Sequence, residues 1–342
     1  MDTTASPTVW RDRASGLLFV LLLALAVYQF AQWAPIRSLG ISALVIGIVC
    51  GMLYGNLLRG NMPLQWGEGV NFAARRLLRI AVAMYGLNIS LAQILEVGAP
   101  GVVVSIGVAV GVLALGTWLG TRWLHLDRDT AMLTSAGSAI CGAAAVLAFE
   151  STLRSAPHKS AVAVATVVLF GTISMFLYPL LFGFGLLPFD GVAMGIFLGG
   201  SIHEVAQVVA AASNFDAETT EVATIVKMTR VALLVPVLLV IGLWLQRRDA
   251  TLTGDRAKLP VPWFAIGFLG FALVNSIGIL PEPLLEALRA ICIFLLTMAM
   301  TALGIQTRFS QIKAAGPRVL ALAAVLFGLL FVLTAGLVKW VT

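Results

Sequence analysis

Charged residues are scarce in this sequence. Only 11% of its 342 residues are Asp, Glu, Lys or Arg, whereas 60% are hydrophobic and the mean hydropathy is +0.99. Soluble domains carry about 25% charged residues, so the composition excludes an ordinary soluble globule and is typical of a polytopic membrane protein. The net charge is nevertheless +6. Because the basic residues lie in short loops between apolar runs, we interpret them as topology signals and not as a nucleic-acid surface.

Several chemical signatures are absent. The three cysteines, Cys50, Cys141 and Cys292, lie in apolar segments without metal-ligand spacing, so we expect no disulfide, no metal site and no cofactor. The sequence has no G-x-x-x-x-G-K-[ST] motif, so direct use of ATP would require another subunit. "HEVAQ" at 203–207 approaches the metalloprotease motif H-E-x-x-H, but Gln207 replaces its second histidine. We therefore expect no enzymatic activity.

The sequence has instead a succession of apolar runs, each about 18–25 residues long, which is enough to cross a hydrocarbon core of ~30 Å as a helix. We predict an all-α polytopic membrane protein with about 9–11 transmembrane segments. Residues 1–342 are interpreted as a single integral membrane transporter domain, with a short interfacial stretch at 63–76 and a polar cytoplasmic loop at 246–260. The predicted segments are 16–33, 39–58, 73–91, 99–121, 129–149, 160–182, 191–213, 221–245, 261–280, 287–306 and 317–340.

The chain repeats parts of itself. "YGLNISLAQILEVGA" (85–99) is similar to "LGIQTRFSQIKAAGP" (303–317), and "SAGSAICGAAAVLA" (135–148) is similar to "LGGSIHEVAQVVAA" (198–211). Chance similarity between apolar segments is the alternative. Inverted repeats are common in secondary transporters, which bind substrate where the repeats meet. We therefore predict an inverted-repeat architecture with halves 39–182 and 191–340.

The loop charges bear on the topology. With a cytoplasmic N-terminus, the positive-inside rule is poorly satisfied if 129–149 and 191–213 both cross the membrane completely. If each segment instead enters and returns on the same side, Arg154 and Lys159 stay in the cytoplasm and the acidic loop at 216–221 lies outside. Two re-entrant hairpins and two complete but interrupted helices both stay open, and either has its break near Gly137–Ser138 or Gly199–Ser201.

The stretch "GGSIHEVAQ" at 199–207 places an ionisable pair, His203 and Glu204, inside an apolar segment. An ionisable residue at membrane depth indicates function by default, and we assign this pair to proton coupling. The alternative is that Glu204 merely caps a helix. Gly-Ser breaks leave helix N-termini that bind anions. The predicted substrate-binding residues are therefore Gly137, Ser138, Cys141, Gly142, Gly200, Ser201, Gln207, Lys227 and Arg230.

Two basic residues follow in the next apolar segment. Lys227 and Arg230 are three apart and share one helix face. We expect them to face the pocket and either neutralise Glu204 or bind an anion with several oxygens. Snorkelling of both side chains to the outer surface is the alternative.

Three motifs resemble a known family. "SAICG" (138–142), "HEVAQVVAA" (203–211) and "VATIVKMTRVALLVP" (222–236) are similar to those of the bacterial inner-membrane family labelled sulfate exporters. The resemblance implies a multi-pass protein of the inner membrane that exports a small oxyanion. We therefore predict a secondary transporter of a small inorganic or organosulfur anion, coupled to protons. A cation/proton antiporter and a passive anion channel are the alternatives. The expected partners are this anion and the lipid bilayer, with no nucleic acid and with homo-oligomerisation left open.

Overall fold

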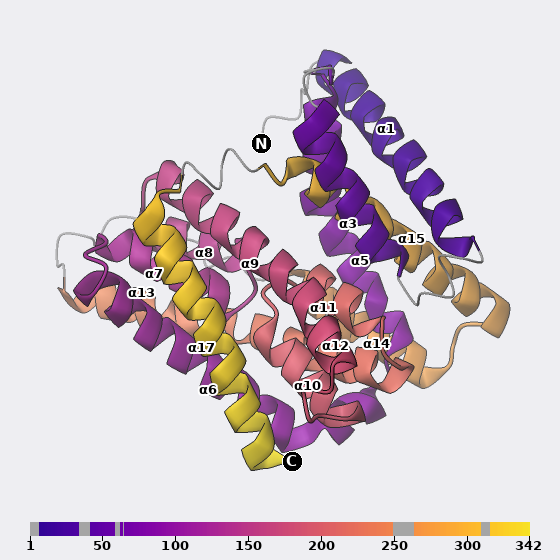
Figure 1. The fold of residues 1–342 in the computed structure, drawn as a ribbon. Coiled ribbons are helices and arrows are strands. Elements are labelled where there is room, and N and C mark those ends of the chain that lie inside the picture. Colours follow the sequence, from indigo (N-terminus) through magenta and orange to yellow (C-terminus); the bar gives the residue numbers. More distant parts are fainter. Residues whose placement is uncertain (1–6, 34–41, 59–61, 64, 249–262, 309–314) are drawn as a thin grey trace. The chain divides into compact units, whose positions relative to one another are not determined.

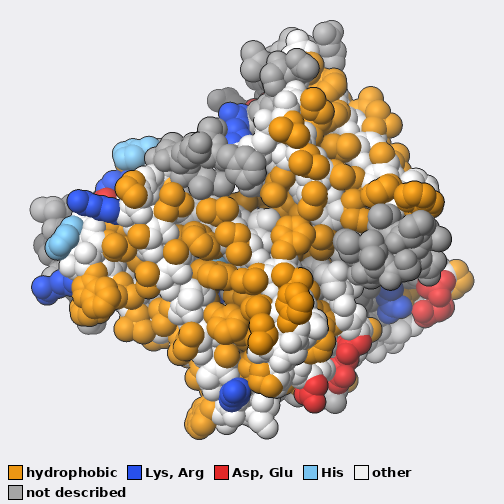
Figure 2. Space-filling model, in the orientation of Figure 1, with side chains coloured by type: hydrophobic (Ala, Val, Ile, Leu, Met, Phe, Trp, Pro, Cys, Tyr) orange, Lys and Arg blue, Asp and Glu red, His pale blue; other side chains and the backbone are white. Residues whose placement is uncertain are grey.

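The computed structural model describes residues 7–33, 42–58, 62–63, 65–248, 263–308 and 315–342. These residues are nearly all helical, and no strand occurs among them (Figure 1). Within the described ranges, six helices are long and apolar enough to cross a membrane, and hydrophobic side chains are spread widely over the face drawn in Figure 2. The prediction of a polytopic α-helical membrane protein is therefore confirmed. The six spans are Arg13–Gln32, Val97–Arg122, His158–Gly183, Ala217–Trp244, Glu282–Gln306 and Pro317–Val341.

The elements follow one another with short connections. They are α1 (Pro7–Gln32), α3 (Ala43–Leu53), η1 (Tyr54–Leu58), α4 (Trp66–Phe72), η3 (Ala73–Leu77), α5 (Leu78–Met84), η4 (Tyr85–Asn88), α6 (Leu91–Arg122), α7 (Arg128–Ala139), α8 (Ala143–Leu153), α9 (Pro157–Gly183), α10 (Gly191–Ser201), α11 (Val205–Ala212), α12 (Ala217–Ala232), α13 (Leu234–Arg248), α14 (Trp263–Ile277), α15 (Glu282–Gln306) and α17 (Pro317–Val341). The predicted polar loop 246–260 lies outside the described residues from 249 onward, and residues 246–248 belong to α13.

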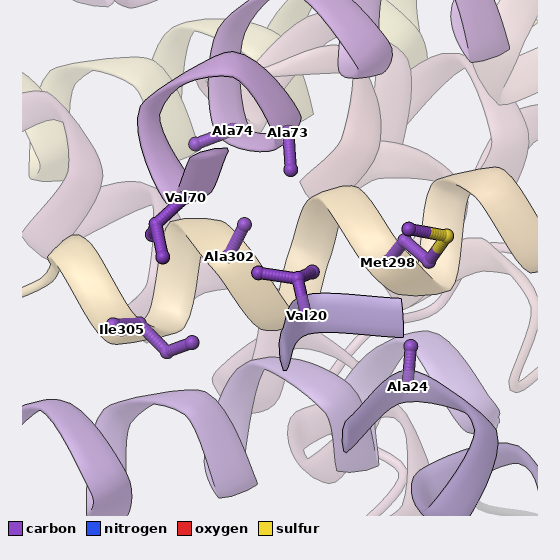
Figure 3. Close-up of a cluster of buried hydrophobic side chains, with 8 residues drawn as sticks. All are labelled: Val20, Ala24, Val70, Ala73, Ala74, Met298, Ala302 and Ile305. Carbon is purple, nitrogen blue, oxygen red and sulfur yellow. The ribbon is translucent and has the colours of Figure 1, made fainter. Parts of the chain in front are cut away.

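The described residues form two compact units. The first unit draws on residues 1–91 and 266–309, and the second on 92–265 and 310–342. In the first unit, apolar side chains of α1, α4, η3 and α15 pack together (Figure 3). Four of the eight are alanines, and such small residues let helices approach closely in lipid. The buried cluster consists of Val20, Ala24, Val70, Ala73, Ala74, Met298, Ala302 and Ile305.

The stretch predicted to be interfacial, 63–76, is different in the structure. From Trp66 it is helical, and α4, η3, α5 and η4 run on without a gap to Asn88. Val70 and Ala73 are buried against α1 and α15. The polar residues of this stretch suggest a surface segment, but its small residues form one packed face of a longer helical segment.

Contacts of two glycines within the first unit support the similarity between residues 85–99 and 303–317. Gly86 lies against the backbone of Phe268 and Ala272, and Gly304 lies against Ile48, Gly51 and Met52. Gly304 follows Gly86 by 218 positions, and Phe268 follows Cys50 by the same number. Gly86 therefore contacts α14, and Gly304 contacts α3, which corresponds to α14 at this spacing. Such reciprocal contacts are the pattern of a two-fold relation.

In the second unit, the segment predicted at 129–149 is a re-entrant hairpin. Helix α7 stops at Ala139, the chain turns over residues 140–142, and α8 begins at Ala143. Lys159, at the start of α9, forms an ion pair with Asp127 at 2.5 Å, just before α7 begins. The two ends of this segment therefore lie together, so the chain enters and returns on the same side. We call residues 128–153 hairpin 1.

The segment predicted at 191–213 is a second re-entrant hairpin. Helix α10 stops at Ser201, the chain turns over residues 202–204, and α11 ends at Ala212. The start of α10 lies beside the start of α12, because the Thr219 hydroxyl donates a hydrogen bond to the Gly191 carbonyl at 3.2 Å. We call residues 191–212 hairpin 2. The two hairpins flank the 27-residue helix α9, one before its start and one after its end, so they begin at opposite ends of α9.

The order of the elements agrees with both sequence similarities, 85–99 with 303–317 and 135–148 with 198–211, if the second repeat is circularly permuted, so that its hairpin comes first. Helices α3, α4–α5 and α6 correspond to α14, α15 and α17 at the spacing of 218, and hairpin 1 corresponds to hairpin 2 at a spacing of 63, from Arg128 to Gly191. Gly98 and Gly316, which are also 218 positions apart, both have a positive φ, of +49° and +81°, and both stand shortly before a proline. The halves 39–182 and 191–340 stay a prediction, in which the hairpin comes fourth in one half and first in the other.

The N-terminus of hairpin 1 yields a pH-dependent prediction. The Asp127 carboxylate accepts hydrogen bonds from the backbone N–H and the hydroxyl of Thr130, at 3.2 and 2.7 Å. Partial burial raises the pKa of Asp127, but the hydrogen bonds from Lys159 and Thr130 outweigh this effect and leave the pKa below its ordinary value of 3.8. Asp127 therefore stabilises the folded state above that value, and the contribution is lost as the pH falls through the lowered pKa.

We expect Asp127→Ala to lower the free energy of unfolding by about 1 kcal/mol at pH 7, as loss of a helix cap does. The difference from wild type should shrink as the pH falls below 3.8, measured by thermal unfolding of the detergent-solubilised protein. Asp129→Ala is the matched control, because Asp129 is also near Lys159, at 3.6 Å, but caps no helix. An effect of Asp127→Ala that persists at low pH would contradict this origin.

Candidate functional site

The turns of the two hairpins meet inside the second unit. The backbone N–H of Ala143, the first residue of α8, donates a hydrogen bond to Oε1 of Glu204 at 3.0 Å. Glu204 is also the N-cap of α11 and forms a capping box with Gln207, whose side-chain oxygen accepts from the Glu204 N–H at 3.2 Å. One buried carboxylate therefore serves the N-termini of two helices, where the peptide dipoles favour negative charge.

Arg230 serves the opposite ends of the same hairpins. Its guanidinium donates to the carbonyls of Ser138 and Ala139 at the end of α7, and to those of Gly199, Gly200 and Ile202 at the end of α10, at distances of 2.7–3.3 Å. The last carbonyls of a helix lack intrahelical partners and carry partial negative charge. Arg230 therefore links the two helix C-termini, and its side chain is 0% exposed.

Lys227 completes this arrangement. Its ammonium donates to the carbonyl of Ile140 in hairpin 1 at 3.0 Å and to that of Ile202 in hairpin 2 at 2.8 Å. Like Arg230 it is 0% exposed, so neither side chain snorkels to the surface. Both cations lie on the buried face of α12 and reach the turns of the two hairpins. Their position agrees with the expectation that they face the protein interior.

The breaks occur two to three residues later than predicted near Gly137–Ser138 and Gly199–Ser201. Helix α10 continues through Ser201, whose hydroxyl donates to the Phe197 carbonyl at 2.6 Å. The N-cap of the second half-helix is Glu204, so the capping role given as the alternative to proton coupling is present in the structure. A carboxylate at this position is favoured by the dipoles of both helix N-termini.

Because the helices end later than predicted, the predicted residues present backbone carbonyl oxygens at the turns and not N–H groups. Ser138 and Gly200 present carbonyl oxygens to Arg230, and Gly137 accepts a hydrogen bond from the Gly142 N–H at 2.9 Å. Gly142 is the residue that needs to be glycine, since its φ is +74°. The assignment of all these positions to substrate binding stays a prediction.

Two more predicted residues lie in the turns. Cys141 lies in the turn of hairpin 1 and is 6% exposed. His203 lies in the turn of hairpin 2, is 1% exposed, and its Nδ1 has no hydrogen-bond partner within the described part of the chain. Glu204 is 7% exposed, whereas the two cations are fully covered.

Three contributors were missed from the sequence. Ala143 binds Glu204 through its backbone, so its side chain gave no signal. Thr172 on α9 accepts from the Gln207 amide at 3.4 Å, and Gly171 lies directly beneath that amide. Tyr178, also on α9, is buried and packs its ring on Phe197 of α10. The sequence "VATVV" at 164–168 of α9 is similar to "VATIV" at 222–226 of α12, and this similarity could have directed attention to α9.

The contact between Gly171 and Gln207 gives a structural prediction. A Cβ at position 171 would lie within 2.7 Å of the Gln207 amide carbon. We expect Gly171→Ala to displace Gln207 from Glu204 and to cost about 1–3 kcal/mol in unfolding free energy, as overpacking does. Gly183→Ala is the matched control on the same helix, because nothing lies within 4 Å of the place that its Cβ would occupy. Equal unfolding temperatures for the two variants would contradict the prediction.

Comparison with known proteins identifies relatives along nearly the whole chain. Residues 15–323 match the model of a family described as conserved hypothetical protein 698. A UPF0324 membrane protein of Bordetella pertussis is 66% identical over all of both chains. One from Pseudomonas putida is 59% identical over 92% of this chain and 90% of its own.

A UPF0324 inner membrane protein, YeiH, of Escherichia coli O6:H1 is 38% identical over 91% of this chain and 90% of its own. These names state a membrane location and no substrate, so they support the membrane family anticipated from the motifs and leave sulfate export as a prediction. The chain is a multi-pass membrane protein and belongs to the UPF0324 membrane protein family.

Proposed function

We propose that this protein is a secondary transporter that binds a small anion, such as sulfate or a sulfonate, where the two hairpin turns meet. The observation that carries the proposal is the charge of this cluster. Two buried cations, Lys227 and Arg230, accompany one buried carboxylate, Glu204. Charge at membrane depth is costly and is retained for function, and an excess of cations favours an anionic substrate over a cation.

The hairpins support transport over catalysis or simple structure. Interrupted helices that enter from opposite sides and meet near the midplane form substrate sites in many secondary transporters. Non-helical backbone at membrane depth is tolerated where it lines a cavity or is buried in protein. We place the protein in the bacterial inner membrane with a cytoplasmic N-terminus, and we propose export as the direction because the motifs resemble those of sulfate exporters.

Proton coupling follows from the position of Glu204. Its carboxylate occupies the N-termini of α8 and α11, which are the groups that a substrate anion would use. A dianion such as sulfate that arrives there competes with the ionised carboxylate and favours its protonated form. Because linkage is reciprocal, protonation of Glu204 strengthens anion binding.

We therefore expect the affinity for sulfate to rise as the pH falls from 8 to 6, by up to about tenfold for each pH unit, the limit set by one bound proton. Glu204→Gln, which mimics the protonated acid, should bind sulfate at least as tightly as wild type does at pH 6 and should lose the pH dependence. If His203 carries the proton, Glu204→Gln will retain that dependence and His203→Ala will abolish it. Wild-type pH dependence in both variants would contradict proton coupling at this pair.

The direct test is a thermal-shift screen on the purified protein with sulfate, methanesulfonate, chloride and sodium salts. A ligand at 100 times its Kd should stabilise the protein by about 2.7 kcal/mol. We expect stabilisation by sulfate or methanesulfonate and none by sodium, with uptake into proteoliposomes that depends on a pH gradient. Stabilisation by sodium alone would favour a cation/proton antiporter, and sulfate flux indifferent to the pH gradient would favour a passive channel.

A further inference from the structure

The charges of the joined turns can be counted helix by helix. Each helix end carries roughly half an elementary charge. The C-termini of α7 and α10 face Lys227 and Arg230, and the N-termini of α8 and α11 face Glu204. Two negative helix ends and two positive helix ends cancel. The side chains then leave the cluster with a net charge of about one positive unit while Glu204 is ionised, and about two units once Glu204 is protonated.

The titratable side chains around the joined turns enter this count as follows. Cys141 in hairpin 1 and Lys227 on α12 interact electrostatically with Glu204, and Arg230 interacts with Cys141 and Lys227. His203 interacts electrostatically with both cations, and a positive imidazole beside two buried positive charges is disfavoured. His203 therefore stays neutral. Tyr178 on α9 interacts with Arg230 but is an uncharged phenol at physiological pH.

We propose that this cluster takes two classes of anion with different proton requirements: a monoanion while Glu204 is ionised, and a dianion together with one proton on Glu204. In each case the loaded site is neutral, which is the state that crosses a low-dielectric core at least cost. The inference rests on the proposed function and specifies its substrate charge and proton count. Sulfate is then carried with one proton and methanesulfonate with none.

The neutral His203 has a defined part in this scheme. Its Nδ1 is buried in the turn of hairpin 2 without a hydrogen-bond partner among the described residues. A buried imidazole nitrogen that lacks a partner is costly, and a bound oxyanion would supply an acceptor for its N–H. The imidazole would thus bind the anion and leave Glu204 as the group that carries the proton.

The experiment measures proton movement and flux in proteoliposomes that contain the full-length protein, with radiolabelled sulfate and methanesulfonate as probes. For wild type we expect one proton per sulfate, none per methanesulfonate, and one negative charge moved per anion in both cases. Over the pH range in which Glu204 is ionised in the unloaded protein, sulfate flux should rise about tenfold for each unit by which the pH falls, as one bound proton requires. Methanesulfonate flux should not rise over this range.

Glu204→Gln removes the proton site and leaves about two positive units. We expect it to carry sulfate without a proton, with two negative charges moved per anion, and to lose most methanesulfonate flux. If the variant does not fold, the wild-type charge and proton counts still decide the matter. Equal proton counts for the two anions, or none with sulfate, would overturn this inference while the proposed function stands. Absence of saturable flux and of binding for both anions would overturn the proposed function itself.

Discussion

Replacing Arg230 with methionine is expected to lower the free energy of unfolding by about 3–5 kcal/mol, the usual cost of removing one partner from a buried charge cluster. The reason is that Arg230 is hydrogen-bonded to carbonyls at the ends of both α7 and α10, and these would be left buried without donors. Thermal unfolding of the purified protein measures the loss. Arg230→Lys keeps the charge but not the forked donors and should recover only part of it.

Thr229→Ala is the control for Arg230→Met. It is the preceding residue on α12, and its hydroxyl bonds only within the helix, to the Ile225 carbonyl at 3.0 Å. We expect a change of less than about 1 kcal/mol, as for a typical hydrogen bond. An unfolding temperature of Arg230→Met as high as that of Thr229→Ala would show that Arg230 does not hold the hairpins together.

Gly142→Ala is expected to uncouple Glu204 from α8. Gly142 has a φ of +74° and a ψ of −133°, a conformation that costs other residues about 1–3 kcal/mol. A Cβ there would also lie 2.6 Å from Oε1 of Glu204. We expect lower stability by that amount and, in addition, loss of the pH dependence of sulfate binding, because the carboxylate can no longer occupy the helix N-terminus.

Gly185→Ala separates the two effects of Gly142→Ala. Gly185 also has a positive φ, +70°, but nothing lies within 4 Å of its potential Cβ. It should share the backbone cost and keep the wild-type pH dependence of binding, measured by titration with sulfate between pH 6 and pH 8. A Gly142→Ala protein with wild-type pH dependence would contradict a direct role of this contact.

The sequence was sufficient for the membrane class and for the location of the charged cluster. Hydropathy and the loop charges around Arg154 and Lys159 predict helices and favour hairpins, because lipid leaves few structural alternatives. The polarity of the turns could not be predicted in this way. Whether Gly200 presents its N–H or its carbonyl depends on a difference of three residues in where α10 ends, and local propensity does not fix helix ends that closely.

The pairing of charges with helix ends was also beyond sequence reasoning. The sequence suggests that Lys227 and Arg230 meet Glu204 or an anion, whereas their hydrogen bonds go to backbone carbonyls of both hairpins. These acceptors carry no side-chain signature. They come together only because the two hairpins, separated along the chain by α9, meet at their turns.

The central claim is that anions bind at the joined hairpin turns, and protection of Cys141 from a small methanethiosulfonate reagent tests it most directly. Cys141 lies in the turn of hairpin 1 and is 6% exposed, whereas Cys292 is 0% exposed, and the test uses a Cys50→Ala variant because Cys50 is only partly buried. We predict that sulfate slows modification of Cys141, with the same concentration dependence as its thermal stabilisation of the protein. An unchanged rate of modification at sulfate concentrations that stabilise the protein would place the anion elsewhere and contradict this claim.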